Sequence, residues 1–285
     1  MAALQEKTVI SADGTSIYAI AAGNPAKPAL VCVHGFASTS FAFHKQFANS
    51  ALLENVFLVA YDGRGNGRSD KPEEAAAYDG RRLAEDFQAV CEAFGVHRPV
   101  VLGWSLGGAI LVSITAYLPP AYVRGIVYTG GGVLTRTIHA AYISAWIVGI
   151  LPTMLGSDAA AAARANVEFV EGLFARPDEV PYEMKLRWLG EIMLAPPCTR
   201  AFIEASSRAL DEKPWAEAMR DMRFLVVQGR HDKLVDAEKM EACLKEQFGK
   251  QLEWVWIEDA GHAPIVEASE EHDAAVIKYM ESLDT

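Results

Sequence analysis

The sequence predicts an α/β protein with a mostly parallel sheet of about eight strands, flanked by helices and interrupted by an inserted helical cap. Three observations lead to this prediction. Short apolar runs alternate with helical patterns over residues 1–132, the strand-like runs stop over residues 133–222, and the alternation resumes over residues 223–285. Strands that alternate with helices pair in parallel, because each helix returns the chain to the start of the next strand. We therefore assign the first and last of these segments to the core and the middle one to the cap.

The core is expected to begin with an antiparallel hairpin, because two strand-like runs at 8–10 and 16–20 flank the turn dipeptide Asp13-Gly14. Residues 78–94 read as an amphipathic helix with apolar side chains at helical spacing. Six further short apolar runs are expected to form the other strands: residues 29–33, 56–61, 100–102, 123–128, 224–227 and 252–257.

The predicted cap consists of helical patterns alone. They cover residues 140–155, 159–174, 182–194 and 198–210, with breaks at Gly156 and at Pro196-Pro197. An insertion of this length between two core strands is expected to lie over the ends of the strands as a lid.

Ser105 lies between a predicted buried strand and a predicted helix, in the pentapeptide Gly103-Trp104-Ser105-Leu106-Gly107. So sharp a strand-to-helix turn pushes a serine hydroxyl out of the sheet, and the flanking glycines avoid clashes across the turn. The start of the helix also places backbone N–H groups beside the hydroxyl. The pattern predicts a nucleophilic serine.

A serine nucleophile needs a base that takes its proton and an acid that orients the base. His262 follows the predicted strand at 252–257, and Asp232 follows the one at 224–227. Both side chains are therefore expected at the carboxyl ends of strands, where open parallel sheets bind ligands. We predict that Ser105, Asp232 and His262 form a catalytic triad.

Two backbone N–H groups are expected to form the oxyanion hole. One belongs to Leu106, directly after the serine, and the other to Phe36, in the loop that follows residues 29–33. Such donors contribute about 3–4 kcal/mol each to the transition state. His34, in the same loop, is expected to brace it by hydrogen bonding.

Taken in order, these motifs resemble the α/β-hydrolase superfamily. The matching segments are His34-Gly35-Phe36, the run Asp62-Gly63-Arg64-Gly65-Asn66-Gly67-Arg68-Ser69, the Ser105 pentapeptide and the loops of Asp232 and His262. The resemblance covers nearly the whole chain apart from its middle third. The second motif is typical of relatives of epoxide hydrolases, haloalkane dehalogenases, esterases and carbon–carbon hydrolases. Epoxide hydrolases and dehalogenases carry an aspartate nucleophile, so the serine favours ester or related acyl chemistry.

Other acids compete for the role of Asp232. Some relatives take the acid from the strand before the cap, but here that strand ends at Thr129 and is followed by glycines alone. Asp259 is too close to His262 in sequence to orient it. Asp62 is interpreted as structural, because an ionised carboxylate there can accept from the backbone N–H groups of its own glycine-rich turn.

The resemblance and the triad together predict a serine carboxylic-ester hydrolase that works through an acyl-enzyme and needs no cofactor or metal. Small to medium apolar substrates are expected from the composition of the cap. Hydrolysis of carbon–carbon bonds, lactones or thioesters, acyl transfer, and a slow-turnover receptor remain open alternatives. The aromatic and aliphatic residues expected to line the substrate pocket are Trp104, Trp146, Ile150, Met154, Phe174 and Trp188.

The net charge of −11 argues against nucleic acid and anionic membranes as partners, because both attract basic surfaces. Residues 1–7 lack the apolar core of a signal peptide. The most apolar segment, residues 138–155, is shorter than the roughly 20 residues that span a bilayer. We expect a cytoplasmic monomer or homodimer that acts on a small molecule, without stable membrane insertion.

Overall fold

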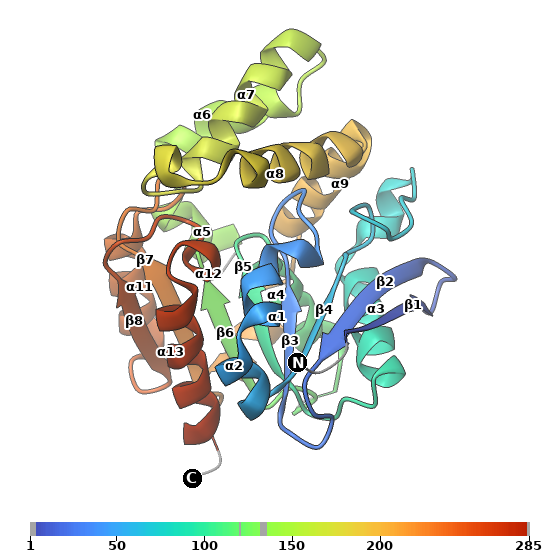
Figure 1. Cartoon of the computed structure of the whole chain (residues 1–285), viewed down its shortest axis with the longest axis vertical. Coiled ribbons are helices and arrows are strands. Elements are labelled where there is room, and N and C mark those ends of the chain that lie inside the picture. Colours follow the sequence, from blue (N-terminus) through green and yellow to red (C-terminus); the bar gives the residue numbers. More distant parts are fainter. Residues whose placement is uncertain (1–3, 120, 132–135, 284–285) are drawn as a thin grey trace.

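The computed structural model describes residues 4–119, 121–131 and 136–283, and its centre is an eight-stranded sheet (Figure 1). The strand order is β1-β2-β4-β3-β5-β6-β7-β8. The strands are β1 (Gln5–Ile10), β2 (Ser16–Ala22), β3 (Ala29–Val33), β4 (Phe57–Tyr61), β5 (Val100–Trp104), β6 (Gly125–Thr129), β7 (Phe224–Gly229) and β8 (Leu252–Ile257). β2 pairs antiparallel with β1 and β4, and all other pairs are parallel. The predicted sheet and its antiparallel edge hairpin are confirmed.

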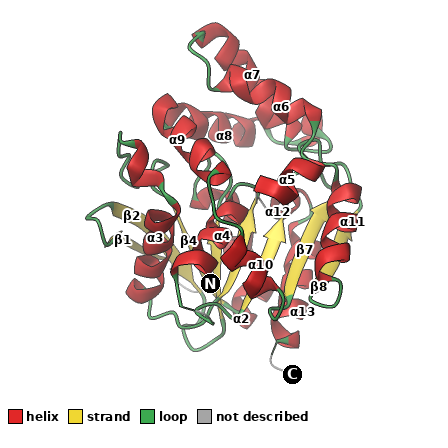
Figure 2. Ribbon diagram, turned by 180° about the vertical axis from the view of Figure 1, so that it is seen from behind, coloured by secondary structure: helices red, strands yellow, loops and turns green. Residues whose placement is uncertain are grey.

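Helices cover both faces of the sheet (Figures 1 and 2). One face carries α3 (Gly80–Ala93), α4 (Gly107–Tyr117), α10 (Lys213–Met219) and α11 (Ala237–Phe248). The other carries α1 (His44–Ala48), α2 (Ser50–Asn55), α12 (Pro264–Glu267) and α13 (Ser269–Ser282). Short 3₁₀ helices are η1 (Ser40–Phe43), η2 (Ala75–Tyr78) and η3 (Pro177–Glu179).

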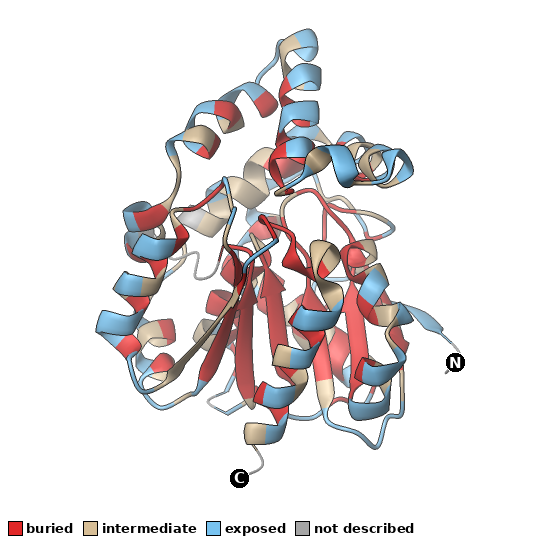
Figure 3. Cartoon of the chain, turned by 60° about the vertical axis from the view of Figure 1, so that its left-hand side comes forward, coloured by how far each residue is buried: buried red, intermediate tan, exposed pale blue. Residues whose placement is uncertain are grey.

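The inner strands β3 to β7 are buried on both faces, whereas the edge strand β1 is largely exposed (Figure 3). Side chains alternate between the two layers: Val31 and Val33 pack with α3 and α4, whereas Leu30 and Cys32 pack with α2 and α13. Burial on both sides explains why the inner strands are apolar throughout instead of alternating with polar residues.

The described part of the segment between β6 and β7 contains helices joined by loops and no β-strand. It contains α5 (Arg136–Tyr142), α6 (Ala145–Met154), α7 (Ala159–Gly172), α8 (Tyr182–Leu194), α9 (Pro197–Arg208) and then α10. The segment from α6 to α9 forms a layer, called the cap, above the carboxyl ends of the strands, whereas α10 packs on α4 in the core layer (Figures 1 and 2). The predicted junction between residues 132 and 133 lies outside the described residues.

Two features of this segment differ from the prediction. The helix expected over residues 140–155 is two helices, α5 and α6, because Ser144 starts a new helix by accepting from the Ile147 N–H group. Helix α10 was not predicted as a separate element. It is anchored to the sheet by Trp215, whose Nε1–H donates to the Tyr128 hydroxyl at 2.8 Å. No helix in the described ranges is long and apolar enough to cross a membrane.

A buried arginine ties the edge hairpin to the core. Arg64 follows β4, and its side chain is fully buried. Its Nε and Nη2 atoms donate to both carboxylate oxygens of Asp86 on α3, at 2.7 and 2.6 Å. Its Nη1 atom donates to Asp13 in the hairpin turn at 2.8 Å and to the Ala77 carbonyl at 2.6 Å. One guanidinium therefore holds the hairpin, α3 and η2 together.

Replacing Arg64 by leucine is expected to lower the free energy of unfolding by about 3–5 kcal/mol, because Asp86 is left buried and unpaired. Urea unfolding followed by circular dichroism measures this change. Arg68→Leu is the control: its exposed pair with Glu6 is expected to contribute about 0–1 kcal/mol. Equal losses in the two variants would contradict the prediction.

Candidate active site

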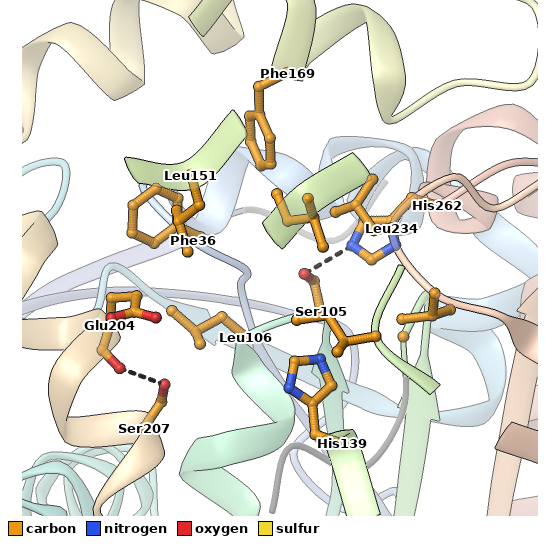
Figure 4. A pocket seen from close by; sticks show the side chains of 14 residues that line it. Phe36, Ser105, Leu106, His139, Leu151, Phe169, Glu204, Ser207, Leu234 and His262 are labelled. Atoms are coloured by element: carbon orange, nitrogen blue, oxygen red, sulfur yellow. Dashed lines mark hydrogen bonds between the residues drawn. The ribbon is translucent and has the colours of Figure 1, made fainter. Parts of the chain in front are cut away.

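The serine turn is as tight as its glycines suggest. Ser105 has a φ of +52°, in the left-handed region, and its N–H donates to the Thr129 carbonyl at 3.0 Å. A Cβ on Gly107 would lie 2.3 Å from the Val33 carbonyl oxygen, and one on Gly103 would lie 2.9 Å from the Gly107 backbone. Helix α4 thus begins directly against β3, which leaves Ser105 at the end of β5 with its hydroxyl directed away from the sheet (Figure 4).

The structure brings Ser105, His262 and Asp232 together in a hydrogen-bonded series. The Ser105 Oγ atom lies 2.7 Å from His262 Nε2, and His262 Nδ1 lies 2.8 Å from Asp232 Oδ2 (Figure 4). The side chains of His262 and Asp232 are 2% and 0% exposed. The geometry fits a neutral imidazole that donates from Nδ1 to the carboxylate and accepts the serine proton at Nε2.

The Asp232 carboxylate is fixed by its own loop and by one glutamine. Oδ1 accepts from the Leu234 N–H at 2.8 Å, and Oδ2 accepts from Gln228 Nε2 at 2.7 Å. The fully buried Gln228 also accepts from the Gly131 N–H, beside the His262 ring. Gln228 was not among the site residues predicted from the sequence. The one sequence feature that could have indicated it is its amide side chain within the otherwise apolar run of β7.

Phe36 and Leu106 lie beside Ser105 and line the same cavity. Neither backbone N–H group donates to another group within the described part of the chain. Both groups therefore lack an acceptor among the described residues, as the donors of an oxyanion hole must before a ligand binds.

His34 and Asp62 brace the loop that contains Phe36. His34 donates from Nδ1 to the Gly35 carbonyl at 2.8 Å and accepts at Nε2 from the Gly63 N–H at 2.9 Å. Burial lowers the pKa of His34, which keeps the ring neutral and Nε2 able to accept. Asp62 accepts from the backbone N–H groups of Arg68 and Ser40, at 2.9 and 2.8 Å. It therefore bonds to its own turn and also to the neighbouring loop.

The cap also contacts this loop. Glu191 on α8 is buried, and its carboxylate accepts from Thr39 Oγ1 at 2.7 Å and from Ser38 Oγ at 3.2 Å. Glu191 was not predicted from the sequence, because a glutamate in an amphipathic helix is expected to be exposed to solvent.

An apolar cavity of about 110 Å³ lies between Ser105 and the cap (Figure 4). Its walls come from the core loops and from α5, α6, α7 and α9. The lining residues are Phe36, Ser105, Leu106, Gly131, His139, Ile143, Ile147, Leu151, Phe169, Glu204, Ser207, Leu234, Val235 and His262.

The predicted pocket residues lie mostly elsewhere. Trp104 and Trp188 line a second, smaller cavity that also contains Ser105. Four others line neither of these cavities: Trp146, Ile150, Met154 and Phe174. For the residues on α6, the orientation of this helix explains why the predicted side chains do not line these cavities.

Helix α6 turns Ile147 and Leu151 toward Ser105, four residues apart on one face. Ile150 and Met154 lie on another face and are buried in the core of the cap. Trp146 packs over Gly172 of α7, where a Cβ would lie 2.3 Å from the indole ring. The apolar composition of α6 alone does not distinguish these faces.

Comparisons with known proteins agree with this architecture. Residues 28–269 match the family model of the alpha/beta hydrolase fold. A candidate aryl esterase from Burkholderia cenocepacia is 26% identical, with a TM-score of 0.86 over 98% of this chain and 99% of that chain. The esterase RhEst1 from a Rhodococcus species is 28% identical, with a TM-score of 0.83 over 98% and 99%.

Curated relatives match over shorter segments. Epoxide hydrolase A from Mycobacterium tuberculosis is 29% identical over 104 residues, which are 36% of this chain and 32% of the relative. The chain spans less than half the length of the curated relatives it matches. The family match covers most of the chain, so the chain belongs to the α/β-hydrolase fold family.

Gly107→Ala is expected to displace the start of α4 from β3, because the new methyl group would overlap the Val33 carbonyl. We expect a loss of about 1–3 kcal/mol in unfolding free energy and slower reaction of Ser105 with a fluorophosphonate. Thermal unfolding and the labelling rate measure the two effects.

Gly190→Ala on α8 is the matched control, because no atom lies within 4 Å of its added Cβ. It is expected to leave the labelling rate unchanged and to stabilise its helix slightly. Normal labelling of the Gly107 variant would show that the turn tolerates a side chain.

Proposed function

We propose that this protein is a hydrolase that cleaves carboxylic esters through an acyl-enzyme on Ser105. The observation that carries the proposal is the hydrogen-bonded series Ser105–His262–Asp232, which ends at an apolar cavity beside two available backbone N–H groups. The likeness to two esterase structures supports the choice of ester chemistry.

In the acylation step, the Ser105 hydroxyl attacks the ester carbonyl carbon while His262 Nε2 takes its proton. Asp232 holds the ring with Nε2 toward the serine and stabilises the imidazolium that forms. Its bond from Gln228 keeps the carboxylate in place without protonating it.

The N–H groups of Phe36 and Leu106 donate to the oxyanion of the tetrahedral intermediate. His262 then gives its proton to the leaving alcohol, and the acyl group remains on Ser105. Water attacks this acyl-enzyme with His262 as base, and the acid leaves as the serine regains its proton.

The cavity favours apolar groups of small to medium size, because aliphatic and aromatic side chains form most of its wall. We also propose that the substrate is a small molecule, that the protein is cytoplasmic and that it is a monomer or homodimer. The net charge of −11 supports a small-molecule substrate over a polyanionic partner.

A fluorophosphonate should add once, at Ser105, as measured by intact mass and peptide mapping. Ser105→Ala should remove the adduct and lower nitrophenyl ester turnover by about 10⁴-fold or more. Asp232→Asn should lower turnover by about 10³–10⁴-fold, because the imidazole loses its correct tautomer. Sustained ester turnover by the Ser105→Ala variant would contradict the proposed mechanism.

The same experiment separates the alternatives. An adduct with single-turnover product release would favour a receptor. Preference for lactones or thioesters in a substrate panel would keep the triad and change the reaction class.

Leu151→Trp should fill the cavity and lower kcat/KM for hexanoate esters by about 10-fold relative to acetate esters. Val148→Trp is the control, because Val148 is exposed on the same helix. Initial rates with nitrophenyl esters of increasing chain length test this. An equal chain-length profile in both variants would place the acyl chain elsewhere.

A further inference from the structure

A carboxylate outside the triad contacts the backbone next to the catalytic histidine. Glu267, the last residue of α12, accepts from the Gly261 N–H at 2.7 Å through Oε2. Its Oε1 atom accepts from the Ala175 N–H at 2.7 Å. Gly261 directly precedes His262, whereas Ala175 follows α7 in the inserted segment. One side chain therefore joins the histidine loop to the cap.

Direct backbone contact reinforces this junction. The Ala263 N–H donates to the Leu173 carbonyl at 3.1 Å, so the residues before and after His262 are both tied to the end of α7. A Cβ on Gly261 would lie 2.6 Å from Ala175 N, which means that the two segments touch without room for a side chain.

His262 is held from its other side by the nucleophile strand. Its carbonyl accepts from Trp104 Nε1 at 2.8 Å, and the Trp104 ring packs against Trp188 of α8 at 5.3 Å. The imidazole already uses both nitrogens, toward Ser105 and Asp232. The distance between His262 Nε2 and Ser105 Oγ therefore depends on the position of the loop backbone.

The Glu267 carboxylate suits this place because two N–H donors converge on it. Burial raises the pKa of Glu267, and the backbone hydrogen bonds oppose that shift. Charge-assisted hydrogen bonds of this kind are stronger than neutral ones. Glu267 makes no hydrogen bond to the reacting side chains, so any effect on the reaction passes through the loop.

We propose that Glu267 is a positioning residue that couples docking of the cap to the alignment of His262 with Ser105. This inference rests on the proposed function, because alignment matters only if His262 is the base. In this proposal the end of α7 has two roles: it covers the cavity, and it holds the loop of His262 in place.

Glu267→Gln tests the inference with little change in shape. The amide has one acceptor oxygen, so it keeps at most one of the two bonds and turns an NH₂ group toward the other N–H. Glu267→Ala removes both bonds. Glu270→Gln is the control, because Glu270 is an exposed carboxylate in the first turn of the adjacent helix.

With nitrophenyl acetate, Glu267→Gln should lower kcat by about 10–100-fold, as loss of a supporting contact does, and leave KM within about threefold. The fluorophosphonate reaction should slow by the same factor, because it also needs His262 as base. Hydrogen exchange at the Gly261 and Ala175 amides should accelerate. The control should match the wild type, and rates are compared well below each thermal midpoint.

A lower thermal midpoint with unchanged kcat in Glu267→Gln would make the residue structural and overturn the inference. So would a rise in KM with unchanged kcat. Both outcomes leave the proposed function intact, because the wild type still labels at Ser105 and turns over esters. A folded wild type that does neither would overturn the proposed function and this inference together.

Discussion

The approach of α4 to β3 at Gly107 is the constraint on which the site depends. Within three residues the chain leaves the sheet at Trp104 and enters a helix, and only a glycine allows the helix to begin against the Val33 carbonyl. This contact forces Ser105 into a left-handed backbone conformation. Strain of this kind persists only where the surrounding structure holds it. Here the parallel sheet provides that support, because β5 is buried and pairs with β3 on one side and β6 on the other.

The other groups of the proposed active site come from loops, and each loop is held by hydrogen bonds from its neighbours. Gln228 fixes the Asp232 carboxylate from within β7. His34 joins the loop of Phe36 to the glycine-rich turn after β4. Loops at the ends of parallel strands are free to vary in sequence, but a reaction requires atoms placed to within a fraction of an ångström. Buried polar side chains that are fully hydrogen-bonded hold these loops in place and so meet this requirement.

Besides forming an apolar wall of the cavity, the cap is hydrogen-bonded to two loops of the core. Two carboxylates bridge it to loops of the proposed active site: Glu191 to the loop of Phe36, and Glu267 to the loop of His262. Each is a glutamate that accepts from backbone or hydroxyl donors, and Glu191 also pairs with Arg187 on its own helix at 3.0 Å. Because a buried carboxylate is costly without such donors, the cap and the loops stabilise each other's placement. In this arrangement the apolar cavity and the loop of His262 are parts of one packed unit.

The sequence by itself determined the sheet, its order of strands and helices, and the residue types of the triad, because apolar runs, glycine turns and strand-end positions are local signals. It did not determine the break at Ser144, the separate α10, or which face of α6 meets the cavity. Those depend on helix rotation and on partners distant in the chain. Gln228 and Glu267 were missed for the same reason: only the tertiary structure decides which buried polar side chain meets which backbone group.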